Sequence, residues 1–209
     1  MERTRLFLIR HGQVEGFESK RYNGQKNVPL TAHGRRQLEA VAERLAGVPL
    51  DAVWSSDLDR CRYGAECLAA PRELPVVYSE RLRELHAGEW EGLSWEDLKR
   101  RYPTEWQARL ADISSYRMPS GESFRDAAQR VLPEVGRLLD SHPGQNVALV
   151  AHGGVNRIIL LDALGASLDK VFCLEQDYAC LNVIDYFADG YRTVRLMNAD
   201  HLPERLCTR

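Results

Sequence analysis

Two short apolar runs, each followed by a histidine and then a glycine, constrain the fold of this chain more than any other feature. The first run is residues 6–9, and Arg10 and His11 follow it; the second is residues 146–151, and His152 follows it. Uninterrupted apolar runs of this length are typical of strands buried on both faces, as in parallel sheets. Because open sheets bind ligands at the carboxyl ends of their strands, both histidines are expected at a ligand site.

The pattern between the two runs predicts an α/β fold. Further strands are predicted near residues 52–55 and 75–78, and helical periodicity follows the first and second strands. This alternation favours a mostly parallel sheet with helices on both faces. A long helix is predicted from Ser123, where Pro133 predicts a kink or a boundary between two shorter helices. Asp189 and Gly190 then favour a hairpin between two late strands.

The 209 residues contain no linker, internal repeat or low-complexity tract. We therefore expect a single domain over residues 1–209, with a partly helical cap or insertion at about residues 80–122, where the strand pattern breaks. Three of the four tryptophans fall in that insertion, and we expect them to form its core rather than to contact a ligand.

The charge and cysteine content exclude several classes of partner. A net charge of −2 gives no reason to expect nucleic acid or an anionic membrane surface. We expect no signal peptide, and no apolar stretch is long enough to cross a bilayer, so a cytoplasmic location is expected. Whether the protein is a monomer or a homodimer is left open. The five cysteines fit no zinc pattern and are predicted to be buried or half-buried free thiols.

The residues after the strands suggest a site for a tetrahedral anion. Arg10 stands beside His11, and either Arg60 or Arg62 begins the helix after the second strand. One histidine at a strand end is more often a structural residue than a catalyst, but two in the same context favour a shared site. Two guanidinium groups and two imidazoles suit phosphate, because a guanidinium pairs with two oxygens at once.

Five motifs, taken in chain order, cover nearly the whole sequence. They are Leu8-Ile9-Arg10-His11-Gly12, Gly24 through Pro29-Leu30-Thr31-x-x-Gly34, Ser55-Ser56-Asp57-Leu58-x-Arg60, Leu82-Arg83-Glu84 with Gly88-Glu89-Trp90-Glu91-Gly92, and Val150-x-His152-Gly153-Gly154. Together they resemble the histidine phosphatase superfamily, which includes phosphoglycerate mutases and small-molecule phosphatases. The resemblance implies a three-layer α/β sandwich of the phosphoglycerate mutase type.

The same resemblance implies a role for each matched residue. His11 is the expected nucleophile, which forms a phosphohistidine. Glu84 is the expected general acid and base. The residues expected to bind the phosphate oxygens are Arg10, Arg60, His152, Gly153 and Asn23. No metal and no cofactor are expected, and the motif favours Arg60 over Arg62.

Some positions depart from the family pattern or stay open. Gln13 replaces a usual acidic residue, Cys61 replaces a usual alanine, and Phe17 stands where many members have an asparagine that contacts the phosphate. Whether Phe17 alters the phosphate contacts is left open. The residues considered for the outer pocket are Tyr22, Asn23, His86, Trp90 and the stretch Ser120-Gly121-Glu122.

The expected function is a phosphomonoesterase that hydrolyses a small phosphorylated metabolite through a phosphohistidine. Within the family, the resemblance is greatest to α-ribazole phosphatases of cobalamin biosynthesis and to broad-specificity phosphatases. Two alternatives remain: a cofactor-dependent phosphoglycerate mutase, and a non-catalytic regulatory protein that binds a phospholigand.

Overall fold

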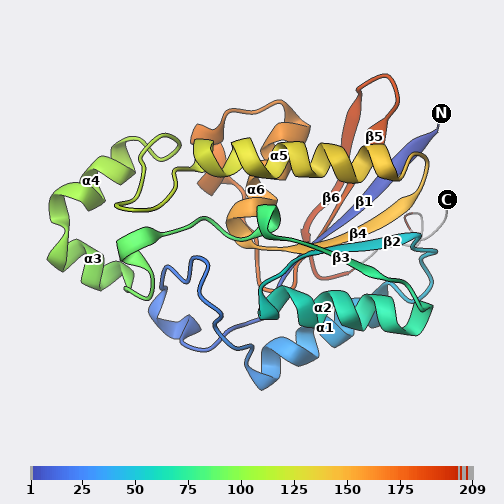
Figure 1. Cartoon of the computed structure of the whole chain (residues 1–209), viewed down its shortest axis with the longest axis horizontal. Helices are drawn as coiled ribbons and strands as arrows, with labels where there is room; N and C mark the ends of the chain where they lie inside the picture. Colours follow the sequence, from blue (N-terminus) through green and yellow to red (C-terminus); the bar gives the residue numbers. More distant parts are fainter. Residues whose placement is uncertain (1, 202, 204–205, 207–209) are drawn as a thin grey trace.

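A six-stranded sheet forms the centre of the molecule in the computed structural model, which describes residues 2–201, 203 and 206 (Figure 1). The strands lie in the order β3-β2-β4-β1-β5-β6. The first four run parallel, β5 pairs antiparallel with β1, and β6 pairs antiparallel with β5. The strands are β1 (Arg3–Arg10), β2 (Ala52–Ser56), β3 (Val76–Ser79), β4 (Asn146–Ala151), β5 (Leu181–Phe187) and β6 (Arg192–Ala199).

Helices cover both faces of this sheet. The two on one face are α1 (Ala32–Arg44) and α2 (Asp59–Ala69); the two on the other are α5 (Phe124–Ser141) and α6 (Gly153–Leu164) (Figure 1). Alternate residues of β1 pack into the two layers: Leu6 and Leu8 join the α5 and α6 side, whereas Phe7 joins the α1 and α2 side. The predicted α/β sandwich with a mostly parallel sheet is therefore confirmed.

The segment of residues 80–122 lies between β3 and α5 and projects from the end of the sheet (Figure 1). It contains two short 3-10 helices, η3 (Glu80–Leu82) and η4 (Gly88–Trp90), and two α-helices, α3 (Trp95–Arg101) and α4 (Pro103–Ala111). Trp90 is fully buried there and stacks on Tyr116. Three further 3-10 helices are η1 (Phe17–Ser19), η2 (Ala70–Arg72) and η5 (Leu168–Cys173).

The helix and strand boundaries differ from the sequence predictions in two places. β1 begins at Arg3, ahead of the apolar run of residues 6–9, because β5 continues beside it: Arg3 lies opposite Phe187, and the Arg5 guanidinium pairs with the buried Asp185 (2.6 and 2.9 Å). Helix α5 continues through Pro133, and no boundary occurs there. Pro133 has no N–H to donate to the carbonyl group four residues earlier. Because Pro133 is exposed, water can donate a hydrogen bond to that carbonyl group instead.

Within the described part of the chain, no helix is long and apolar enough to cross a membrane.

Candidate active site

The two predicted histidines meet at the carboxyl ends of adjacent strands. β1 and β4 pair in parallel, with Arg10 opposite Ala151, so His11 and His152 leave the sheet side by side. The backbone N–H of His11 donates to the Ala151 carbonyl (3.0 Å), and the two ring centroids are 5.2 Å apart. The sequence prediction that these residues share one site therefore agrees with the geometry.

The His11 ring is held in one tautomer. Its Nδ1 lies 2.8 Å from the Gly12 carbonyl oxygen, which can only accept, so Nδ1 carries the proton and Nε2 keeps a lone pair. Burial and then the nearby charges of Arg60 and Arg10 hold the pKa of His11 well below its usual value of 6.5. The ring is thus neutral at physiological pH, as a nucleophile must be.

His152 lies behind the cavity rather than in its wall. Its side chain is fully buried; Nδ1 accepts from Arg60 Nε (3.3 Å), and Nε2 lies 2.9 Å from the Ser56 hydroxyl. Burial, Arg60 and His11 lower the pKa of His152 well below 6.5. With both ring nitrogens engaged, His152 supports Arg60 in this conformation, and direct contact with phosphate stays a prediction.

Two arginines stand beside His11. The Arg10 guanidinium donates to the Gln176 carbonyl (2.5 Å) and lies 4.1 Å from the centre of the Tyr178 ring, while its Nε is buried without a partner among the described residues. Arg60, at the start of α2, is 1 % exposed and donates to the carbonyl groups of Lys26 (2.6 Å) and Gly24 (2.8 Å). These bonds fix both cations next to His11.

Arg62, the alternative to Arg60, faces away from the site. Its Nε donates to the Asp57 carbonyl (2.8 Å), and its guanidinium group covers the ring of Tyr78. Arg60, which the family motif favours, lines the cavity described below, and Arg62 does not.

Glu84 connects the segment of residues 80–122 to the start of α6. Its carboxylate accepts hydrogen bonds from the backbone N–H groups of Leu85 (3.0 Å) and Gly154 (3.1 Å). A Cβ atom at Gly154 would lie 2.5 Å from Glu84 Oε1, so only glycine lets the carboxylate approach this helix end so closely. The start of α6 therefore holds the Glu84 side chain at the cavity.

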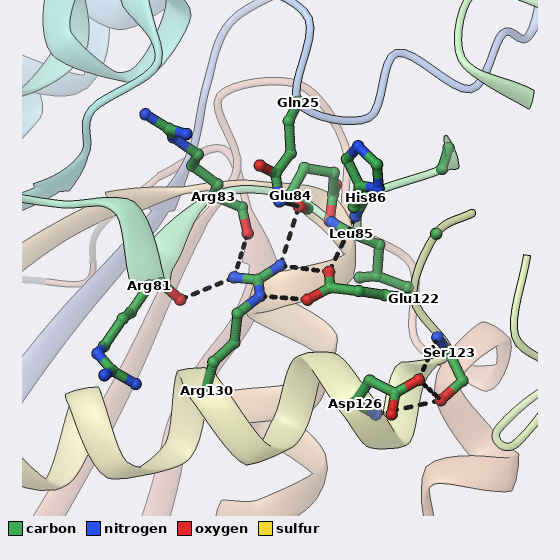
Figure 2. A network of polar contacts seen from close by, with 12 residues as sticks. Gln25, Arg81, Arg83, Glu84, Leu85, His86, Glu122, Ser123, Asp126 and Arg130 are labelled. Atoms are coloured by element: carbon green, nitrogen blue, oxygen red, sulfur yellow. Dashed lines mark hydrogen bonds and ion pairs between the residues drawn. The ribbon is translucent and has the colours of Figure 1, made fainter. Parts of the chain in front are cut away.

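Arg130 of α5 holds the main chain on both sides of this carboxylate (Figure 2). Its guanidinium group donates to the carbonyl oxygens of Arg81 (2.8 Å), Arg83 (2.7 Å) and Glu84 (2.9 Å). It also makes a two-point ion pair with Glu122 (2.7 and 2.8 Å). Every N–H of the guanidinium group therefore donates a hydrogen bond, and these bonds fix the backbone at Glu84.

Two further contacts complete this network. Glu122 Oε2 accepts from the backbone N–H of His86 (2.9 Å), and Gln25 donates to the Glu84 carbonyl (3.2 Å). The Arg130 guanidinium lowers the pKa of Glu122 despite its burial, so this carboxylate is ionised. Sequence reasoning missed Arg130; its one local signal is its position three residues after the buried Ala127, at the edge of the apolar face of α5.

A cavity of about 750 Å³, including its open mouth, contains His11 and most of the predicted site. The predicted residues that line it are Arg10, His11, Tyr22, Asn23, Arg60, Glu84 and Gly153. The residues whose contact with a ligand was left open lie elsewhere: Phe17 is part of η1, Trp90 is buried in its own aromatic cluster, and His86 and Glu122 are outside the lining. Gly24 and Gly154, which belong to the five sequence motifs, also line the cavity. The lining residues that sequence reasoning missed are Arg21, Leu85, Arg109, Met118, Phe124, Arg157, Phe172 and Tyr178.

The cysteines are free thiols where the structure describes them. Cys61 and Cys180 are buried and Cys67 is half-buried, but Cys173, the last residue of η5, is exposed, contrary to the prediction. Cys207 lies outside the described residues. Cys61 Sγ lies 3.4 Å from His152 Nε2, and burial raises the pKa of its thiol, which therefore stays protonated. No group of three or more His, Cys, Asp or Glu side chains in the described chain is arranged to hold a metal ion.

Comparison with known proteins gives consistent matches. The family model described as "Histidine phosphatase superfamily (branch 1)" matches residues 6–199. A bifunctional protein of Mycobacterium tuberculosis is 37% identical over 198 residues, which are 93% of this chain and 54% of that protein, so the chain spans about half the length of this relative.

Two further matches cover nearly the full length of both partners. The adenosylcobalamin/alpha-ribazole phosphatase of Escherichia coli is 30% identical over 195 residues, 93% of this chain and 96% of that protein. The crystal structure of the alpha-ribazole phosphatase from Shigella flexneri superposes with a TM-score of 0.87 at 30% identity, covering 95% of this chain and 98% of that one.

Proposed function

Because the chain belongs to the histidine phosphatase superfamily, we propose that it is a metal-independent phosphomonoesterase that acts on a small phosphorylated metabolite. The observation that carries the proposal is the His11 tautomer: Nδ1 is bound to the Gly12 carbonyl, and the ring lines a cavity beside Arg10 and Arg60. A neutral imidazole with a free Nε2 next to two cations suits attack on a phosphate dianion.

The proposed reaction has two displacements at phosphorus. His11 Nε2 forms a bond to phosphorus while the bond to the ester oxygen breaks, and Glu84 gives its proton to that oxygen. Glu84 then takes a proton from water, whose oxygen attacks phosphorus; the N–P bond breaks, and inorganic phosphate leaves with His11 restored. Arg10 and Arg60 offset the charge on the other phosphate oxygens in both steps.

The first test is to trap the phosphoenzyme. Wild-type protein, quenched within milliseconds of mixing with a phosphate ester labelled on phosphorus, is expected to carry acid-labile phosphate, and activity is expected to persist in EDTA. His11→Ala is expected to lose the label and about 10³-fold or more of the turnover. His33→Ala is a matched control, because His33 also precedes a glycine but is exposed on α1.

The outcome separates the proposal from its alternatives. Unchanged turnover in His11→Ala, or loss of turnover in EDTA, contradicts the mechanism, and binding of phosphate esters without turnover supports a regulatory protein. Conversion of 3-phosphoglycerate to 2-phosphoglycerate, with little release of phosphate, supports a mutase. α-Ribazole 5'-phosphate belongs in the first panel of substrates, because two similar proteins are named alpha-ribazole phosphatases.

A further inference from the structure

Arg60 reaches the cavity from α2, but a loop far from α2 in sequence holds its guanidinium group. Nη1 donates to the Lys26 carbonyl (2.6 Å), and Nη2 donates to the Gly24 carbonyl (2.8 Å). Residues 24–26 belong to no helix or strand that would fix these two carbonyl groups. The position of Arg60 in the cavity therefore depends on whatever holds this loop.

Glu91, from the segment of residues 80–122, binds the same peptide group as Arg60. The carbonyl of that peptide belongs to Gly24 and accepts from Arg60, while its N–H belongs to Gln25 and donates to Glu91 Oε1 (2.8 Å). The carboxylate, the planar peptide group and the guanidinium group thus form one chain of hydrogen bonds from an anion to a cation. Because bonds in such a chain polarise and strengthen one another, Glu91 fixes the direction in which the Gly24 carbonyl holds Arg60.

The close approach of this carboxylate to the loop requires glycine at position 24. The φ of Gly24 is 50°, in the left-handed region, and a Cβ atom there would lie 2.1 Å from Glu91 Oε1. The Glu91 side chain is only 10% exposed, and its backbone carbonyl accepts from Lys26 Nζ (3.0 Å). Glu91 therefore contacts the loop at each of residues 24–26.

The same carboxylate also contacts the segment that carries Glu84. Its Oε1 accepts from the backbone N–H of Ala87 (3.4 Å), and the Gln25 side chain donates to the Glu84 carbonyl (3.2 Å) (Figure 2). Burial lowers the pKa of Arg60, and the negative charge of Glu91 counteracts that shift. Glu91 thus joins the two parts of the chain that hold the cation and the carboxylate of the cavity.

We propose that Glu91 is a positioning residue, which sets the place of the Arg60 guanidinium group through the peptide between Gly24 and Gln25. This inference rests on the proposed phosphatase activity, in which Arg60 offsets charge on the phosphate oxygens. Glu91 does not line the cavity, so it acts through Arg60 rather than on the substrate. Its loss therefore weakens the binding of the phosphoryl group, whichever alcohol leaves.

The test compares Glu91→Met, which removes both carboxylate oxygens at similar length, with Glu91→Gln, which keeps an amide oxygen for the Gln25 N–H. We expect Glu91→Met to lower kcat/KM by about 10- to 100-fold, since a displacement near 1 Å costs this much in positioning. The loss should be equal for an alkyl phosphate and p-nitrophenyl phosphate, because Arg60 acts on the phosphate oxygens. The inhibition constant of inorganic phosphate should rise as well, and Glu91→Gln should restore most of both.

A double substitution supplies a readout that a purely structural role would not change. If Glu91 acts through Arg60, adding Glu91→Met to Arg60→Ala should lower kcat/KM by less than about 2-fold further. Asp51→Ala is the matched control, because Asp51 also accepts a distant backbone N–H, that of Asn146 (2.9 Å), but at the amino ends of β2 and β4. It should lower the free energy of unfolding and keep wild-type kinetics.

Gly24→Ala tests the same contact from the side of the loop. Its methyl group would take the place of the Glu91 carboxylate, so we expect an equal loss on both esters that again disappears in the Arg60→Ala background. This second variant keeps the inference testable if Glu91→Met does not fold.

The outcomes distinguish this inference from the proposed function. Wild-type kinetics in Glu91→Met, a loss confined to alkyl phosphates, or an equal loss with and without Arg60 would overturn the positioning role and leave the phosphatase proposal intact. A wild-type protein that hydrolyses no ester would contradict the proposed function instead. In that case, weaker binding of inorganic phosphate to Glu91→Met than to wild type, measured by calorimetry, would still support the positioning of Arg60.

Discussion

His11 depends on neighbours that its local sequence only partly reveals. The adjacent Gly12 carbonyl selects the tautomer, while burial and two arginines keep the ring neutral. Arg10 is next to His11 in sequence, but Arg60 belongs to α2 and follows His11 by 49 positions. The place of His11 at the end of a buried strand was therefore predictable from residues 6–12, whereas its electrostatic setting required the fold.

Glu84 illustrates a residue that local patterns could not identify. It is one of 30 acidic residues, and only the motif around it marked it out. We expect Glu84→Gln to reduce kcat by about 10²–10⁴-fold for alkyl phosphates, because the leaving alkoxide then lacks a proton donor. The loss should be much smaller for p-nitrophenyl phosphate, whose leaving group is stable without a proton. Steady-state kinetics on both substrates checks this.

An equal loss on both substrates would show that Glu84 does not act as the acid. Glu89→Gln is a suitable control in the same segment, because Glu89 contacts the Ser120 hydroxyl rather than the cavity. It is expected to behave as wild type with both esters.

Arg109, Arg130 and Arg157 were missed for a common physical reason. Each lies on a helix where an arginine usually extends into solvent, and nothing in the local pattern distinguishes it. Each has a partner far away in sequence: Arg109 reaches the Tyr22 hydroxyl, Arg157 the Leu174 carbonyl, and Arg130 residues 46 to 49 positions earlier. Such contacts follow from the packing of complete elements, not from neighbouring residues.

At the scale of elements, the guanidinium group of Arg130 in α5 binds the backbone of the segment that carries Glu84. A lysine at position 130 would keep the charge but could not reach three carbonyl groups and a carboxylate at once. We expect Arg130→Lys to lower kcat for alkyl phosphates by about 10- to 100-fold, since a displacement near 1 Å costs this much in positioning. KM should change little, and p-nitrophenyl phosphate should be affected less, which kinetics on both esters will show.

Arg137→Lys is a matched control on the same helix. Arg137 also makes a two-point ion pair, with Glu134 (3.1 and 2.6 Å), but in the described chain it donates no hydrogen bond to residues 80–86. If it reproduced the leaving-group dependence of Arg130→Lys, the effect would arise from the stability of α5 rather than from the position of Glu84.

The strands and helices themselves were largely predictable. Buried strands appear as apolar runs because both faces of the sheet are covered, and Thr31 caps α1 as its type suggests, accepting from the Gly34 N–H (2.9 Å). Local rules failed where a distant partner decides the outcome. β1 starts at Arg3, ahead of its apolar run, because β5 continues beside it and Asp185 pairs with Arg5. Pro133 leaves α5 intact only because that face of the helix is open to water.

For the whole molecule, the two buried histidines link stability to pH. Both have folded-state pKa values below 6.5, so the unfolded chain binds protons that the folded chain does not. Their contribution is therefore complete above pH 6.5 and is lost as the pH falls toward the folded values. We expect the free energy of unfolding to decrease below pH 6.5 by up to about 1.4 kcal/mol per pH unit for each histidine. Urea unfolding at pH 7.5, 6.5 and 5.5 measures this slope.

Replacing one of the histidines separates their effect from that of other groups. His11→Gln is expected to reduce the slope by up to about half, while the exposed His33→Gln should leave it unchanged. A free energy of unfolding that stays constant between pH 7.5 and 5.5 in the wild type would contradict neutral, buried imidazoles.

The order of the chain has a practical consequence for protein engineering. Residues 93–121 form one uninterrupted stretch that contains α3, α4 and Arg109, whereas His11, Glu84, Glu122 and Arg130 all lie outside it. A single cassette exchange would thus replace one wall of the cavity and keep the side chains assigned to phosphate chemistry. If the proposed function holds, libraries built at this one locus would vary which ester is accepted while His11 and Glu84 stay in place.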